Sequence, residues 1–159
     1  MSKSPGGVRA QLANAVDWND AHAGFDAAVK EFPPALRGRR VEGLPHSAWQ
    51  VLEHLRIAQH DILDFARNPK YREMKWPDDY WPASPEPPDE KAWDKSVAAF
   101  KRDRRAVRKL AEDPKVKIEK RIPHGTGQTY LREVLLVIDH NAYHIAELVI
   151  LRRLLGAWK

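Results

Sequence analysis

The stretch Thr129–Leu155, TYLREVLLVIDHNAYHIAELVILRRLL, decides the fold of this chain. At about 100° per residue, many of its apolar residues fall on one face of a helix. That face also carries two histidines one turn apart. The stripe comprises Val137, His140, Asn141, His144, Leu148, Leu151 and Leu155. Because both imidazoles point the same way, one ion or substrate could touch both, and the rest of the chain must cover this helix.

Three more segments show apolar residues at helical spacing. They cover residues 8–32, 48–67 and 90–112. We expect the first to break or restart near residues 17–21, where aspartate and asparagine can cap a helix. A capping box of Ser47 and Gln50 precedes the second, and Asp89 is the expected N-cap of the third. With the last helix, these segments predict an all-α four-helix bundle.

Two connecting segments differ from ordinary short loops. Lys70–Pro88 holds two tyrosines, two tryptophans and five prolines, and a connection of this length is uncommon unless it is functional or tightly packed. It either forms a lid over a site or closes one end of the core. In Lys115–Gln128 the apolar residues alternate weakly, which predicts a short extended piece but no sheet.

The composition limits the possible functions. The 159 residues are enough for one domain with its own core, and we expect 1–159 to be that domain, with 1–7 as a loose tail. Cysteine is absent, which excludes disulfides, thiolate metal sites and a cysteine nucleophile. There is no apolar run of about 18 residues and no apolar core of a signal peptide. We therefore expect no membrane span and a cytoplasmic protein.

The net charge of +5 raises the question of a nucleic-acid partner. The basic residues cluster in Arg37–Arg40 and Lys101–Lys109. The second cluster has the pattern of the solvated face of an amphipathic helix, and it lacks the interleaved aromatic residues and the motifs of nucleic-acid binding. We therefore expect no nucleic-acid partner.

The histidine pair of the last helix has a structural and a chemical interpretation. Each imidazole has a donor and an acceptor to satisfy, and a divalent cation would satisfy both acceptors at once. The His-Glu-x-x-His pattern of metallopeptidases is absent because Asn141 follows His140. A carboxylate-bridged di-iron site is disfavoured because neither Glu53 nor Glu147 stands three residues before a histidine. A mononuclear site with three neutral ligands and open positions remains.

Four stretches of the chain closely resemble the DinB/YfiT-like superfamily, which is unrelated to the DNA polymerase that shares the DinB name. They are AHAGFDAAV, HSAWQVLEHLRIAQHDILDF, KWPDDYWP and IPHGTGQTYLREVLLVIDHNAYHIAELVILRRLLGAW. The resemblance covers nearly the whole chain. It implies a four-helix bundle with the helix order 1-3-2-4, commonly assembled as a homodimer.

The resemblance also implies one divalent metal ion, zinc or nickel. In the family, one histidine of the second helix and two of the last helix hold this ion. The matching positions here are His54, His140 and His144, so all three ligands are present.

Other residues are weaker candidates for the same site. Glu133 and Glu147 flank the histidine pair on the last helix, and Asp61 lies two turns beyond the histidine of the second helix. Each could accept an imidazole N–H or act as a general base, or it could simply form an ion pair. His22 and His124 could line the mouth of a substrate pocket.

The family includes thiol S-transferases that use bacillithiol and a mycothiol-dependent isomerase. The resemblance therefore implies a divalent-metal-dependent enzyme of the thiol-S-transferase or hydrolase type, which activates a thiol or a water. The expected partner is a small-molecule substrate, such as a low-molecular-weight thiol. The alternative is a non-catalytic protein with a structural or sensing metal.

Overall fold

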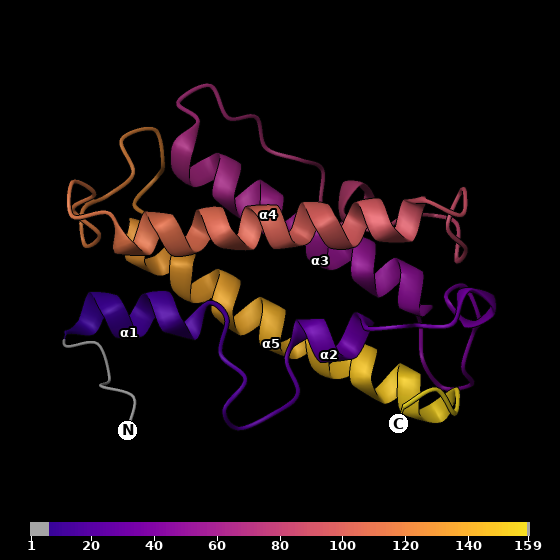
Figure 1. Cartoon of the computed structure of the whole chain (residues 1–159). Coiled ribbons are helices and arrows are strands. Elements are labelled where there is room, and N and C mark those ends of the chain that lie inside the picture. The colour runs from indigo at the N-terminus through magenta and orange to yellow at the C-terminus, as the bar shows by residue number, and fades with distance from the viewer. Residues whose placement is uncertain (1–6, 159) are drawn as a thin grey trace.

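The computed structural model describes residues 7–158, so the expected tail at 1–7 lies outside this range except for Gly7. Within the range the chain forms five α-helices and no β-strand, which confirms the predicted all-α class (Figure 1). The short extended piece predicted in 115–128 appears as an isolated antiparallel bridge between Arg121 and Thr129. The helices are α1 Val8–Ala15, α2 Phe25–Val29, α3 Ala48–Arg67, α4 Ala92–Glu112 and α5 Tyr130–Leu154.

The first predicted helix is two helices in the structure. α1 and α2 follow one another along the same side of the bundle (Figure 1), and residues 16–24 separate them. The indole N–H of Trp18 donates to the Asp20 carboxylate at 2.6 Å, and Gly24 precedes α2 in an extended conformation. α1 packs against α4 and α2 against α5, so the two short helices together occupy the place of one.

α3 is the central helix and packs against both α4 and α5. It begins with the predicted capping box, in which the side chains of Ser47 and Gln50 each accept the other residue's backbone N–H. α5 begins as predicted after Thr129, whose side chain accepts the N–H of Arg132. The helix order of the bundle stays a prediction drawn from the family resemblance.

The start of α4 differs from the prediction. The helix begins at Ala92, and Lys91 occupies the N-cap position. Asp89 instead accepts the N–H of Lys91 at 2.8 Å and closes a turn ahead of the helix. An aspartate can cap a turn as well as a helix, and here it caps the turn.

The core consists of two apolar clusters. The first includes Phe25, Phe32, Leu52, Leu55, Trp93, Phe100, Leu148 and Leu151, and the second includes Leu12, Val16, Leu63, Val107, Val134 and Val137. Along α3, α4 and α5, the stretch between these clusters carries buried polar side chains: Gln59, Asp103, Asn141 and His144. We call this stretch the polar layer.

α5 is the most apolar of the long helices. By length and composition alone it could cross a membrane. In the structure one of its faces packs along α3, as in the core helix of a bundle. The opposite face leaves Leu135, Tyr143, Ile150 and Leu154 exposed.

Candidate metal centre

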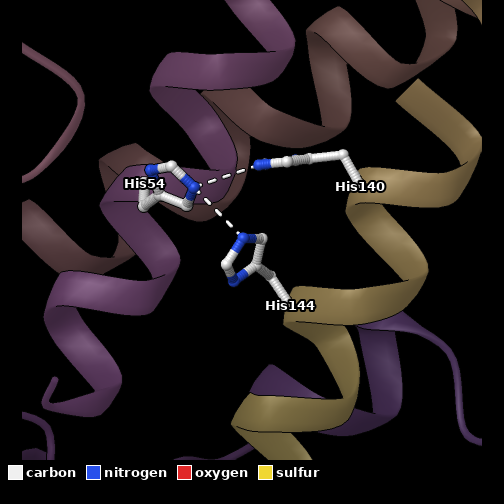
Figure 2. Close-up of side chains that lie close together, drawn as sticks. All are labelled: His54, His140 and His144. Atoms are coloured by element: carbon white, nitrogen blue, oxygen red, sulfur yellow. Dashed lines mark hydrogen bonds between the residues drawn. The ribbon is translucent and has the colours of Figure 1, made fainter. Parts of the chain in front are cut away.

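The three histidines at 54, 140 and 144 converge at the polar layer. Figure 2 shows the imidazole of His54 on α3 pointing toward the imidazoles of His140 and His144 on α5. The Nε2 atom of His54 lies 3.0 Å from Nε2 of His140 and 3.1 Å from Nε2 of His144. One ring nitrogen of each residue lies within 4.8 Å of the other two. This group could hold a metal ion.

Two hydrogen bonds determine which nitrogen carries the proton in His54 and His144. Nδ1 of His54 lies 3.0 Å from the backbone carbonyl of Tyr80, and Nδ1 must donate because a carbonyl can only accept. Nδ1 of His144 donates to the carboxylate of Glu147. In a neutral imidazole the other nitrogen then has a lone pair. The inward nitrogen of neutral His54 is therefore a lone pair, and it lies 3.1 Å from Nε2 of His144.

Burial keeps the rings of His54 and His140 neutral. Desolvation is the main reason why the pKa of His54 falls from 6.5 to about 4. Desolvation, followed by the nearby His144, also lowers the pKa of His140 from 6.5 to about 4. Only 2% of His54 is exposed. Near neutral pH, these two rings are therefore uncharged, as metal ligands must be.

A divalent cation fits this donor set. Zinc binds imidazole nitrogens tetrahedrally at about 2.0–2.1 Å, which places two such nitrogens about 3.3 Å apart. The observed 3.0 and 3.1 Å are close to this separation. A cation between these nitrogens would bind through their lone pairs. Three neutral ligands also leave a position for a water or a substrate.

The segment 70–88, predicted as a lid or a plug, lies fixed beside the site. The backbone carbonyls of residues 80, 82 and 85 accept hydrogen bonds from the side chains of His54, Gln50 and Ser47 respectively. Residues 80–85 therefore run along the first turns of α3 as a strap. This strap orients the imidazole of His54.

Trp81, in the same strap, covers the ring of His54. The two rings stack with centroids 3.7 Å apart and planes 4° apart. His46 also stacks on Trp81, with centroids 3.7 Å apart and planes 9° apart. Sequence reasoning did not identify Tyr80, Trp81 or His46 as site residues. The aromatic content of 70–88 was the available signal, but it did not show which residues lie at the site.

The two glutamates proposed beside the histidine pair have different surroundings. Glu147 contacts His144 directly. Glu133 is only 3% exposed and pairs with Arg132 at 2.8 Å, which is the ion-pair alternative considered for it. Glu147 is thus the carboxylate that the structure brings to the imidazoles.

Asp61 is connected to the site through Tyr80. Its carboxylate accepts the hydroxyl protons of Tyr71 at 2.9 Å and Tyr80 at 2.6 Å. Asp61 therefore holds the side chain of Tyr80, and the backbone carbonyl of Tyr80 holds the imidazole of His54. Burial and then the Asp61 hydrogen bond raise the pKa of both tyrosines, so their hydroxyls stay protonated.

The structure separates the two histidines predicted to line a pocket. His22 is exposed in the connection between α1 and α2, and its Nδ1 lies 3.2 Å from the carbonyl of Ala23. His124 donates from Nε2 to the carbonyl of Phe65 at 2.6 Å and lines a cavity of about 470 Å³. Of these two histidines, His124 therefore lines this cavity and His22 does not.

Two buried amides join the polar layer across three helices. Asn141 donates to the side-chain carbonyl of Gln59 at 2.9 Å, and Gln59 donates to the backbone carbonyl of Phe100 at 2.8 Å. Sequence reasoning placed Asn141 on the buried stripe but gave no role to Gln59. A glutamine on the inner face of 48–67 was the available signal.

Comparison with known proteins identifies a family. The model of the DinB superfamily matches residues 17–148, which include all three histidines. Comparison with curated proteins and with solved structures finds no match.

Proposed function

Because the chain belongs to the DinB superfamily, we propose that it is a metal-dependent enzyme in which His54, His140 and His144 hold one zinc or nickel ion. The convergence of the three imidazoles carries this proposal, because Nε2 of His54 lies 3.0 Å from Nε2 of His140 and 3.1 Å from Nε2 of His144. The reaction is the transfer of a low-molecular-weight thiol to an electrophile, or hydrolysis of a small molecule.

The chain supplies orientation and a dry surrounding for this chemistry. A divalent ion held there would lower the pKa of a thiol or water that it binds, which makes a nucleophile near neutral pH. The carbonyl of Tyr80 and the carboxylate of Glu147 hold Nδ1 of their histidines so that Nε2 points inward. Such hydrogen bonds also raise the basicity of the ligand. Trp81 shields one face of His54 from water.

The proposed setting is a cytoplasmic homodimer. The cytoplasm keeps small thiols reduced. The exposed face of α5 supports a dimer, since Leu135, Tyr143, Ile150 and Leu154 are between 47% and 67% exposed and exposed apolar side chains gathered on one helix favour an interaction surface. Sedimentation velocity of the wild type and of Ile150→Glu tests this, because the charged variant should be monomeric.

Nucleic acid is not part of the proposed function. The basic residues of α4 are largely engaged in ion pairs: Lys101 and Arg104 contact Asp26, and Arg108 pairs with Glu112 at 2.9 Å. A solvated or paired face explains these charges without phosphate contacts.

Metal analysis combined with an activity screen tests the enzyme proposal. Purified wild type should retain one equivalent of zinc or nickel, and His54→Ala should lose both metal and thiol–electrophile turnover while staying helical. His22→Ala, which removes an exposed histidine away from the three-histidine group, is the matched control. Normal metal content in all three single alanine variants would refute the ligand set.

Chelation distinguishes an enzyme from a protein with a structural metal. If the ion is catalytic, the chelated protein should keep its helical circular dichroism and lose turnover. If the ion is structural, chelation should unfold the bundle. Retained metal with no turnover in the screen would favour the non-catalytic alternative.

A further inference from the structure

A cavity of about 470 Å³ is lined by residues of α3 and α5 and of the two connections 70–88 and 121–129. Tyr80 forms part of its wall, and the carbonyl of the same residue holds His54. Leu136 also lines it, one turn before His140. Cavities of this size are typical of small-ligand sites. Tyr80 and Leu136 thus connect the wall of the cavity to the elements that hold the three histidines.

Several hydrogen-bond donors in the wall of this cavity already have acceptors within the protein. The hydroxyls of Tyr71 and Tyr80 both donate to Asp61, at 2.9 and 2.6 Å. His124 donates from Nε2 to the backbone carbonyl of Phe65, so this N–H is used as well. A ligand that satisfies these acceptors must bring its own donors.

The charge of the cavity is negative although the chain carries +5. Three carboxylates line it, from Asp61, Glu73 and Glu133, and Arg132 is the cation among the lining residues. Arg132 already pairs with Glu133 at 2.8 Å. Carboxylates in a concave surface concentrate cations.

Aromatic rings complete the wall. Phe65, Tyr71 and Tyr80 line the cavity, and Phe65 packs edge-to-face against Tyr71 with ring centroids 5.2 Å apart. Faces of such rings attract organic cations. Acceptors, negative charge and aromatic rings thus favour the same class of ligand.

We propose that this cavity binds the organic part of the substrate and that this part carries a protonated amine. Asp61 and Glu73 contact the ammonium group, and the aromatic rings contact the carbon skeleton. The inference rests on the proposed function, because it places the reacting end of that molecule at the three histidines. Carboxylate-bearing molecules of the same size are disfavoured.

Binding of three ring compounds to the metal-free protein tests the proposal. Benzylammonium, neutral benzyl alcohol and anionic benzoate share a ring and differ in charge. By calorimetry at neutral pH, benzylammonium should bind at least about tenfold more tightly than the other two, and added salt should weaken it. Its binding should also shift the NMR signals of Tyr71 and Tyr80.

Two variants with a matched control locate the binding. Asp61→Asn and Glu73→Gln should each weaken benzylammonium binding about tenfold. Glu73 is an exposed residue of the cavity wall. Glu73→Gln therefore tests the effect of a carboxylate on binding even where Asp61→Asn disturbs the fold. Glu42→Gln removes an exposed carboxylate elsewhere and should bind as the wild type does.

The outcomes separate this inference from the proposed function. Equal affinity for the three compounds, or unchanged binding in Glu73→Gln, would overturn the assignment of the cavity. The binding assay needs neither metal nor turnover. Selective amine binding by a protein that retains no metal would therefore support the amine site in the cavity and refute the metal-dependent function. If the protein retains metal but does not bind the amine selectively, only the assignment of the cavity as an amine site is refuted.

Discussion

Mild acid should destabilise the metal-free protein before most carboxylates are protonated. The pKa values of His54 and His140 fall from 6.5 to about 4 in the folded protein, because burial disfavours the charged ring. On unfolding both return to about 6.5. Between these values the unfolded chain binds more protons than the folded one. The stability that the neutral rings contribute is therefore present above pH 6.5 and is lost as the pH falls toward 4.

The magnitude follows from the width of this window. From about pH 6.5 to about pH 5, each ring would lower the free energy of unfolding by about 2 kcal/mol, at about 1.4 kcal/mol per pKa unit. Solvent screens part of this effect, particularly at His140, which is only half-buried. We therefore expect about 1 kcal/mol for each ring and about 2 kcal/mol for the pair.

Urea unfolding followed by circular dichroism, in the presence of a chelator, measures this loss at about pH 7 and about pH 5. The control is the double variant His54→Gln and His140→Gln, which keeps the carboxylates of the wild type. Its free energy of unfolding should change with pH by about 2 kcal/mol less than that of the wild type. Equal pH dependence in both proteins would refute the reasoning.

Three further results are expected. Glu147→Gln should weaken zinc binding about 10–100-fold in a competition assay with a chelating dye, because the amide replaces the carboxylate that accepts the Nδ1 proton of His144; unchanged affinity would contradict this role. Ser47→Ala should lower the free energy of unfolding in urea by about 1–2 kcal/mol, because it removes the cap of α3 and a hydrogen bond to the strap. Gln59→Leu should lower it by about 1–3 kcal/mol, because Asn141 and the carbonyl of Phe100 lose their partner. Changing Asn141 to leucine as well should recover part of this loss, and no recovery would show that the two amides do not act as a pair.

The helices could be predicted from the sequence where their signals are local. The capping box of Ser47 and Gln50 and the cap at Thr129 involve neighbours in the chain, and both are present. The start of α4 was missed because Asp89 can cap a turn or a helix, and local sequence does not choose between them. The break in 8–32 was located, but its length depends on packing against α4 and α5.

The site could be predicted only in part. Helical spacing places His140 and His144 on one face of α5, but His54 lies 86 residues before His140, and only the family resemblance pointed to it. Tyr80 acts through a backbone carbonyl and Trp81 through the face of its ring. Neither contact has a sequence pattern, because each depends on how the strap lies along α3.

The distribution of unsatisfied groups in the polar layer favours a ligand site over a purely structural role. Gln59 has hydrogen-bond partners on both α4 and α5, as a buried polar group in a stable core requires. In the described range 7–158, the buried side-chain atoms that lack a well-formed hydrogen bond are Nδ1 of His140 and Oδ1 of Asn141, and a weak interaction between these two side chains offsets part of the fall in the pKa of His140. Both belong to neighbouring residues at the three-histidine group, where Nε2 of His54 also lies 3.1 Å from Nε2 of His144. A core selected only for stability would not gather these costs at one point, whereas a site for a cation would.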